Sequence, residues 1–519
     1  MCRYTGAGAP VYFFAPCGTI KRKEVVCVGF FDRNSGQPHP RKEPRLTQPL
    51  TVEGMAEVFR DCVDFKTREV CVGNDPARRL TLCYLEGVVR NERVSDYILQ
   101  PLARAERLAK VTEEELLRLM RDGALYNLTA TERTTTDEAA VDLVAGCTLI
   151  FVPGRDGVLS YFTGTEEKRA VGQPENEPSV KGARDSFVET VRTNTAMVRR
   201  RLRAPELRIC EYVVGRQTLT QVDVLWLDGV ADPKVVEEVR RRVADMDVDG
   251  IRTAGDVEEY LTDRWSTPFP LVASTQRPDW FCGGLMAGRV GILCEGQSVG
   301  WLAPGTLGLF FQAGQDRTSN WMLATMLRLL RYFCMFVTLL LPALYVAVVT
   351  FHPEMLPVKL ARSIAAAKQE VPFSAVFEVL ILLVAFEVLQ EAGLRLPGSV
   401  GQTVSILGGL VVGSAAVEAR IVSPAVLIAV ALAGIAGYTA PSQDFSGALR
   451  LWRFGLTLLA SVAGLLGVVL GCGGLVYHLA GLNSFGVPYL GGAAVVRAPI
   501  PFEKLRPGAL DTPNRRERR

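Results

Sequence analysis

Residues 332–351 read YFCMFVTLLLPALYVAVVTF, and no other stretch constrains the architecture of this chain as strongly. The stretch has no charged side chain, and about twenty apolar residues are what a helix needs to cross the hydrocarbon core of a bilayer. Arg328 and Arg331 flank its start. The stretch therefore predicts a membrane-spanning helix in the second half of a chain of 519 residues.

Four more apolar stretches follow it: Phe373–Leu389, Thr403–Val417, Val422–Thr439 and Phe454–Leu479. Residues 352–372, between the first two stretches, are predicted to form an amphipathic helix at the interface. The soluble part shows no export signal and the tail is basic, so both ends are expected in the cytoplasm, which requires an even number of crossings. The short, glycine-rich Thr403–Val417 is therefore predicted to be re-entrant.

Charge divides the chain into two parts. Residues 1–320 hold 87 charged side chains, whereas residues 321–480 hold 16. The contrast is typical of a soluble part followed by a membrane part. It argues against a wholly soluble enzyme, a disulfide scaffold and a disordered protein. Neither part has the dense basic face of a nucleic-acid-binding protein.

The soluble part alternates predicted strands and helices, and one pattern occurs twice. Residues 82–88 and residues 225–230 each read as a strand, an acid–glycine turn and the start of a helix. The repeat favours two related subdomains, although coincidence between two common units is the alternative. The predicted fold class is tandem α+β or α/β subdomains followed by an α-helical multi-span membrane domain.

The predicted boundaries follow from these patterns. They are an irregular arm at 1–50, a first subdomain at 51–165, a linker and polar helix at 166–202, a second subdomain at 203–320, the membrane domain at 321–480 and a basic cytoplasmic tail at 481–519.

Five short motifs share an order with one known family. They are EPSVKGARDSFVET at 177–190, RPD at 277–279, LPALYVA at 341–347, QEAGLRLP at 390–397 and SFGVPY at 484–489. In this order they resemble the A subunits of GerA-type spore germinant receptors. The motif residues singled out are Glu177, Lys181, Gly182, Arg184, Asn194, Arg277, Asp279, Pro342, Arg395 and Pro397. The first fifty residues and residues 316–321 depart from the family pattern.

The resemblance implies an integral protein of the spore inner membrane. Family A subunits are expected to form homo-oligomers, plausibly pentamers, around a cation-conducting pore. The implied partners are a transporter-like B subunit that binds the nutrient, a lipoprotein C subunit and membrane lipid. A paralogous type, stage V sporulation protein AF, is the alternative, as an accessory channel in ion or dipicolinate release; a membrane carrier is a third. No catalytic constellation is found in the sequence, and no cofactor is expected.

Two pairs of charged residues are candidates for a pore or a subunit contact. Glu378 and Glu387 lie inside an apolar stretch, where a carboxylate costs about 2.5–3.5 kcal/mol and is expected to face a cavity, a partner or a cation. Nine positions separate them, which is two and a half helical turns, so they face opposite sides. The alternative is a helix end whose acids reach lipid headgroups. Glu418 and Arg420 are predicted to close a tight hairpin at the membrane surface, or else to form a gating ion pair.

A weak calcium pattern occurs in the soluble part. Asp245, Asp247, Asp249 and Asp256 occupy positions one, three, five and twelve of a calcium loop, with Gly250 at position six. A calcium loop normally has a bidentate Glu at position twelve. Turn and helix-cap carboxylates explain the same residues without a metal, and that interpretation is favoured.

Overall fold

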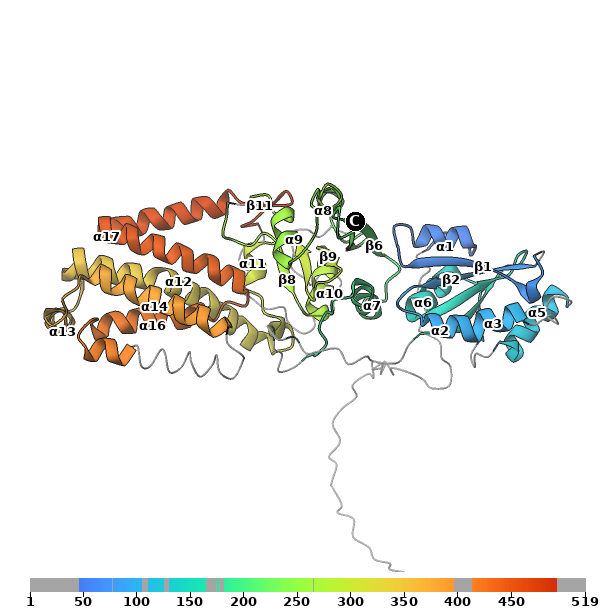
Figure 1. Cartoon of the computed structure of the whole chain (residues 1–519), viewed down its shortest axis with the longest axis horizontal. Helices are drawn as coiled ribbons and strands as arrows, with labels where there is room; N and C mark the ends of the chain where they lie inside the picture. The colour runs from blue at the N-terminus through green and yellow to red at the C-terminus, as the bar shows by residue number, and fades with distance from the viewer. Residues whose placement is uncertain are drawn as a thin grey trace, which may run out of the picture. The chain divides into compact units, whose positions relative to one another are not determined.

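The computed structural model describes residues 46–76, 78–104, 111–125, 130–164, 174, 177, 182–264, 266–395 and 413–491. These residues form two five-stranded antiparallel sheets and, after them, a group of long apolar helices (Figure 1). The predicted irregular arm falls almost entirely, and the basic tail beyond residue 491 wholly, outside the described residues.

The first sheet has the strand order β1-β2-β4-β5-β3 and helices on both faces. Its strands are β1 (Phe65–Cys71), β2 (Arg79–Leu85), β3 (Ala130–Arg133), β4 (Cys147–Phe151) and β5 (Val158–Phe162). Its helical segments are α1 (Val52–Val58), η1 (Val72–Asn74), α2 (Asn91–Val94), η2 (Ser95–Leu99), α3 (Gln100–Arg104), α5 (Glu113–Leu119), η3 (Met120–Ala124) and α6 (Thr136–Ala145). Side chains alternate along β2, so Cys83 packs with α1 and α6 while Leu82 packs with α3 and α5 on the other face.

The second sheet has the strand order β6-β7-β9-β10-β8, which is the same order counted from its own first strand. Its strands are β6 (Leu207–Val214), β7 (Thr220–Leu227), β8 (Ala273–Thr275), β9 (Val290–Cys294) and β10 (Gly300–Ala303). Its helical segments are α7 (Val191–Arg201), α8 (Pro233–Ala244), α9 (Ala254–Leu261), α10 (Pro278–Met286), α11 (Leu307–Phe310) and η4 (Gly314–Arg317). Helices α7 and α10 pack on one face, and α8 and α9 on the other.

The two units also agree in the order of their helices along the chain. Each runs helix, two strands, helices, strand, helix and two strands, as the repeated pattern predicts. One assignment is corrected: α7, which the sequence analysis places in the linker, is the first helix of the second unit. Val191 and Val198 are buried against that sheet. The sequence of α7 looks polar because one of its buried residues is an arginine, Arg199, so it does not show that the helix is packed on a sheet.

The apolar helices follow the second sheet. They are α12 (Trp321–Phe351), α14 (Ala375–Arg395), α16 (Pro424–Gly437) and α17 (Gln443–Ala480), with η5 (Pro353–Met355) and α13 (Val358–Gln369) between the first two. Four of the five predicted apolar stretches fall largely within these helices. Residues 403–412 lie outside the described residues, so the re-entrant Thr403–Val417 stays a prediction.

Helix α17 reverses direction at Gly464, which corrects the single segment predicted at Phe454–Leu479. Gly464 has φ +60° and ψ −136°, a backbone conformation that favours glycine. The rings of Trp452 and His478 lie 5.6 Å apart, whereas a straight helix would separate these residues by about 39 Å. The two arms therefore form an antiparallel hairpin, and the reversal point lies against Phe351 and His352 at the far end of α12.

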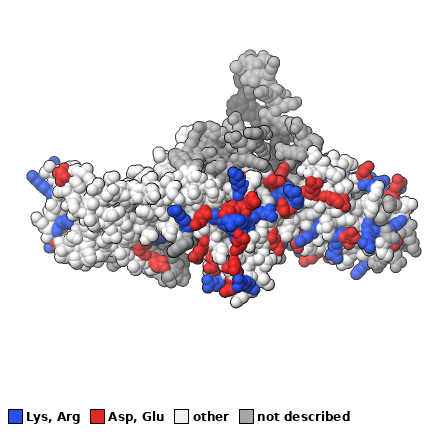
Figure 2. Space-filling view, turned by 90° about the horizontal axis from the view of Figure 1, so that it is seen from above, with Lys and Arg blue, Asp and Glu red and all other residues white. Residues whose placement is uncertain are grey.

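The outer surface of these helices is apolar. In the most apolar stretch of α12, and likewise of α17, only 33% of the residues are buried, and Phe333, Val462 and Val469 are largely exposed. Figure 2 shows charged side chains gathered over the sheets and an almost uncharged surface over the apolar helices. A helix from the core of a soluble protein would instead be covered on most sides. Helix α12 is long and apolar enough to cross a membrane.

Candidate functional site

One buried carboxylate fixes the start of α12 to the second unit. Asp316, in η4, is 2% exposed and accepts hydrogen bonds from Arg328 and Arg331, with nitrogen–oxygen distances of 2.8–2.9 Å. Arg331 also donates to the carbonyl oxygen of Phe311 at 3.0 Å. Because two guanidinium groups share one acid, moving the first turns of α12 breaks several charge-assisted hydrogen bonds.

A small hairpin fixes the end of α17 to the same unit. It consists of β11 (Asn483–Ser484) and β12 (Val487–Pro488), directly after the helix. The Ser484 hydroxyl donates to the carbonyl oxygen of Leu271 at 2.6 Å and accepts from the Gly305 amide at 3.1 Å. The hairpin is therefore bonded both to the segment before β8 and to the segment after β10.

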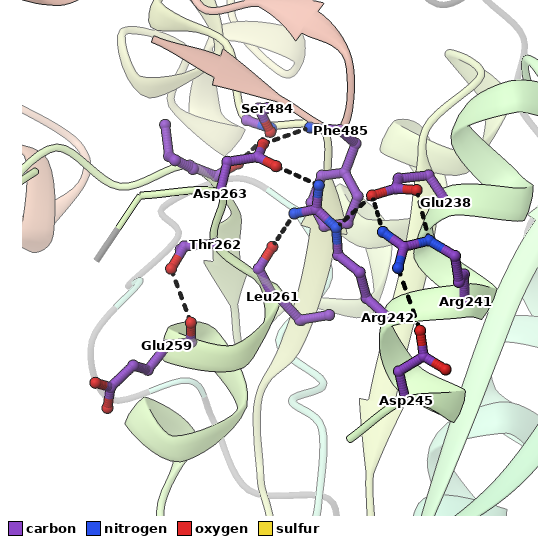
Figure 3. A network of polar contacts seen from close by, with 12 residues as sticks. Glu238, Arg241, Arg242, Asp245, Glu259, Leu261, Thr262, Asp263, Ser484 and Phe485 are labelled. Carbon is purple, nitrogen blue, oxygen red and sulfur yellow. Dashed lines mark hydrogen bonds and ion pairs between the residues drawn. The ribbon is translucent and has the colours of Figure 1, made fainter. Parts of the chain in front are cut away.

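Arg242 of α8 is the centre of a polar network beside this hairpin (Figure 3). Its guanidinium donates to Glu238 at 2.8 Å, to the carbonyl oxygen of Leu261 at 2.7 Å, and to Asp263. It also lies 4.3 Å from the centre of the Phe485 ring, a cation–π contact. Asp263 accepts from the Phe485 amide at 3.1 Å. One arginine thus connects α8, the end of α9 and the hairpin.

Aromatic packing completes this contact region, which we call the junction: η4, the loop before β8, the turn after β10, the two ends of α17 and the β11–β12 hairpin. His478 Nε2 lies 2.9 Å from the Thr267 hydroxyl, and its ring is 6.1 Å from that of Phe269. Phe445, at the start of α17, stacks on Phe310 with ring centres 5.9 Å apart. The start and the end of α17 therefore contact the same unit.

The two sheets are connected by a different kind of contact. Arg199 of α7 is fully buried and makes a bidentate ion pair with Asp64, with both distances 2.9 Å. Burial alone would lower the pKa of Arg199, but the charge of Asp64 raises it above its ordinary value. Two backbone hydrogen bonds, from Val63 to Ile209 and from Ile209 to Asp61, accompany the pair.

A buried acid of the second unit, Asp223, has no hydrogen bond from its side chain among the described residues. Asp223 of β7 is fully buried, and neither of its oxygens has a hydrogen-bond partner among the described residues. Burial raises its pKa to about 7, although Arg192, 3.6 Å away, acts in the opposite direction. Arg192 bonds instead to Glu211.

The predicted candidates Glu378 and Glu387 lie in different surroundings on α14. Glu387 is half-buried and bonds to Arg450 and to Arg453 of α17, each at 2.9 Å. Glu378 is fully buried, and its Oε2 accepts a hydrogen bond of 2.7 Å from the amide of Ser423, directly before α16. Both acids therefore face neighbouring helices of their own chain, and whether either also contacts a pore stays a prediction.

Glu418 and Arg420 do not pair with each other. Glu418 is exposed, and Arg420 forms an ion pair of 3.4 Å with Glu370, which follows α13. Arg420 has φ +54° and lies in the turn between the helical residues 413–418 and α16. This placement agrees with a hairpin turn and not with an ion pair between the two.

Three of the four acids of the calcium pattern, Asp245, Asp247 and Asp256, have separate partners. Asp247 pairs with Arg216 at 2.8 Å, and Asp245 with Arg241 at 3.2 Å. Asp256 accepts from two backbone amides at the start of α9, where it completes a capping box. Within the described part of the chain, no group of three or more His, Cys, Asp or Glu could hold a metal ion, so the calcium hypothesis is wrong for these residues.

The family-motif residues in the soluble part lie around α7 and α10. The buried Asn194 accepts from the Val188 amide at 2.8 Å and donates to its carbonyl oxygen at 2.6 Å. Arg277 is buried and forms a bidentate pair with Asp279. Burial raises the pKa of Glu177, which accepts from Thr275 at 2.7 Å. These residues fix the entry into the second unit.

The remaining motif residues are placed as follows. Gly182 and Arg184 are exposed, Pro342 is buried inside α12, Arg395 ends α14, and Lys181 and Pro397 lie outside the described residues.

The acids and bases that connect the parts of the molecule were not predicted from the sequence. Asp316, Arg450 and Arg453 stand within or beside apolar stretches, and that position was the available signal. Asp64 and Arg199 gave no comparable signal, because each lies among other charged residues.

Comparison with known proteins places these features in a family. The family described as Bacillus/Clostridium GerA spore germination protein matches residues 53–507. Spore germination protein KA of Bacillus subtilis (strain 168) is 36% identical over 453 residues, which is 87% of this chain and 83% of that protein. Spore germination protein B1 of the same organism is 32% identical over 447 residues, 84% and 92% of the two chains.

Two further similarities concern a membrane protein and a solved structure. The uncharacterized membrane protein YfkQ of Bacillus subtilis (strain 168) is 35% identical over 483 residues, 91% of this chain and 92% of that protein. The crystal structure of the N-terminal domain of the A subunit of the Bacillus megaterium spore germinant receptor GerK3 is 29% identical. The match covers 51% of this chain and 98% of the GerK3 domain, with a TM-score of 0.40.

Proposed function

The chain belongs to the GerA family of spore germination proteins, and from that membership we propose that it is a membrane subunit of a spore germinant receptor. Its apolar helices and the naming of its relatives identify it as a membrane protein. One observation carries the proposal: the similarity to spore germination proteins KA and B1 runs through the sheets, the junction and the apolar helices alike.

In this proposal the chain oligomerises into a nutrient-gated channel for monovalent cations. Its partners are other copies of itself, a transporter-like B subunit and a lipoprotein C subunit. The exposed apolar faces of α12 and α17 support such an assembly, because they offer surface to lipid and to neighbouring subunits. The proposed location is the spore inner membrane, with the sheets on the cytoplasmic side, and the proposed role is not enzymatic.

The junction supplies a route for mechanical coupling. The start of α12 and both ends of α17 are bonded to the second unit. A shift of these helices relative to the membrane would therefore pull on the second sheet at several points. We propose that the partner subunit moves the helices and that the second unit transmits the movement to its neighbours in the oligomer.

The test measures potassium release from spores after addition of nutrient. The strain lacks the chromosomal gene and carries either the intact chain or Arg242→Met, which removes the cation–π contact and the hydrogen bonds at the hairpin. We expect deletion to abolish release through this receptor, the intact chain to restore it, and Arg242→Met to slow it at normal protein level.

Arg216→Met is the matched control, because Arg216 also pairs with an aspartate but is 70% exposed and far from the hairpin in sequence. It should behave like the intact chain. If deletion leaves every nutrient response unchanged, the receptor role is wrong. If both arginine variants behave alike, the junction does not carry the coupling.

A further inference from the structure

Three buried side-chain oxygen atoms of the apolar helices have no hydrogen bond of normal distance and angle among the described residues. They are Oε1 of Glu378 on α14, Oγ of Ser423 at the start of α16 and the hydroxyl of Tyr345 on α12. Glu378 and Ser423 are completely buried. The Tyr345 hydroxyl lies next to Ser423 and within electrostatic reach of Glu378. Buried oxygen atoms are normally satisfied. The hydroxyls of Tyr345 and Ser423 can bond to each other, whereas Oε1 of Glu378 is left open to a ligand or a proton.

The chain around these atoms is built like an ion site in a membrane protein. The helical residues 413–418 stop, the backbone unwinds through Arg420 at φ +54°, and α16 begins after Ser423. The amides of Ile421 and Val422 both bond to the carbonyl oxygen of Ala416, so the turn is compact. Interrupted helices with unwound backbone form the sites at which transporters hold substrates and monovalent cations.

Charge at the cluster is only partly balanced. The amide of Ser423 donates to one oxygen of Glu378, and the positive end of α16 offsets about half a charge. Lys368 of α13 lies within electrostatic reach of Glu378, but no ion pair within 4 Å joins these two described residues. A net negative site of one carboxylate and two neutral oxygens therefore remains.

We propose that Glu378, Ser423 and Tyr345 bind one monovalent metal cation, sodium or potassium, within a single subunit. One carboxylate with neutral oxygens matches a single positive charge, whereas divalent ions are typically held by several carboxylates. The cation connects α12, α14 and α16, and it lies inside the subunit and not along a pore between subunits. Its presence stabilises the packing of these three helices.

The experiment uses the purified full chain in lipid nanodiscs, without nutrient or spores. Thermal unfolding is followed in potassium chloride, sodium chloride and choline chloride at equal ionic strength, and binding is measured by equilibrium dialysis with ²²Na⁺ and ⁸⁶Rb⁺. We expect one alkali ion to raise the unfolding temperature relative to choline, with about one ion bound per chain. Whichever ion acts identifies the ligand.

Variants locate the site. Glu378→Gln should abolish the ion-dependent shift, and Tyr345→Phe and Ser423→Ala, which change single oxygens, should each weaken ion affinity about tenfold, or about 1.4 kcal/mol. Lys368→Met should strengthen it, because a competing positive charge is removed. Glu418→Gln, an exposed acid in the turn beside the cluster, is the matched control and should leave affinity unchanged.

Two outcomes would overturn the proposal. In the first, the intact chain unfolds at the same temperature in all three salts and retains no labelled ion, so a proton or water satisfies the cluster. In the second, an ion binds but Tyr345→Phe, Ser423→Ala and Lys368→Met all leave its affinity unchanged. Neither outcome bears on the receptor role, which is tested by nutrient response in spores.

Discussion

The two sheets have the same strand order but different neighbours. The first sheet, with helices on both faces, meets the second unit through one buried ion pair, a few backbone hydrogen bonds and side-chain hydrogen bonds from Arg208 and Cys62. The second shares a continuous hydrophobic core with the apolar helices, in which Phe269 and Phe310 from the sheet unit meet Phe445 of α17. The two copies of one fold therefore make different contacts. The difference arises from residues outside the repeated pattern, such as Phe269 and Phe310.

The difference implies two mechanical roles. The first unit is attached mainly by polar contacts around one buried ion pair, so breaking that pair should loosen the connection. A unit that shares its core with the helices moves together with them. Substitutions at the two connections should therefore have different consequences, and the following predictions test this from the largest expected effect to the smallest.

The largest effect is expected at the connection to the helices. Asp316→Asn leaves Arg328 and Arg331 buried without their acid, which should cost about 3–5 kcal/mol of stability. Thermal unfolding of the full chain in nanodiscs measures it. Asp247→Asn is the control, because its ion pair with Arg216 is about 70% exposed and should contribute at most about 1 kcal/mol. Equal effects of the two variants would contradict a special role for Asp316.

A smaller and more local effect is expected between the sheets. Arg199→Met leaves Asp64 buried and unpaired, at a cost of about 3 kcal/mol. Hydrogen exchange should show faster exchange at the Val63 and Ile209 amides and unchanged protection in the apolar helices.

The control for this variant is Arg79→Met, whose partner Glu69 is 63% exposed, and it should change neither region. Equal loosening of the apolar helices in Arg199→Met would show that the two connections are not independent.

A third prediction concerns how the stability of the second sheet depends on pH. An aspartate in the unfolded chain titrates near 3.9, whereas burial raises the pKa of Asp223 to about 7. The folded state then binds the proton more tightly, so stability falls as pH rises from about 4 to about 7. Between pH 5 and pH 8 the intact chain should lose on the order of 2 kcal/mol through this group.

Asp223→Asn should remove that loss, measured as unfolding temperature against pH. The first sheet has Thr81 at the corresponding place, four residues before the end of β2, and Thr81→Val should leave the pH profile unchanged. An Asp223→Asn profile parallel to that of the intact chain would assign the pH dependence to another group.

The smallest effect is expected at the hairpin. Ser484→Ala removes one hydrogen bond from the Leu271 carbonyl and one from the Gly305 amide, which keep their 2.8 Å bond to each other, and should cost about 1 kcal/mol. Faster hydrogen exchange at Gly305, with unchanged exchange in β2, would be the signature. Equal exchange rates at Gly305 in the intact chain and the variant would mean that the Ser484 hydroxyl does not hold the hairpin in place.

Much of the sheet architecture could be predicted from the sequence. Strands β2 and β7 end directly before the acid–glycine turns of the repeated pattern, as predicted, because that pattern depends only on neighbours along the chain. The repeat was recognisable from its turns for the same reason. The reversal of α17 was not, because Gly464 stands among several other glycines and nothing local shows which of them adopts positive φ.

The candidate site was predicted only in part. Glu378 and Glu387 stood out because carboxylates are rare in apolar stretches. Their partners did not, because Ser423 lies 45 positions after Glu378, and Arg450 lies 63 positions after Glu387. Such contacts depend on how helices pack, which periodicity within one helix does not specify.

The reversal at Gly464 gives the chain an unusual connectivity. Both ends of the apolar part return to the second sheet, so residues 321–480 are inserted between that sheet and the β11–β12 hairpin, the last described strands that bond to it. The inserted helices are attached to the second unit at both of their ends. The helices can tilt or separate from one another, but breaking one attachment does not release them from the domain. A force applied anywhere on the inserted helices is therefore divided between η4 and the hairpin.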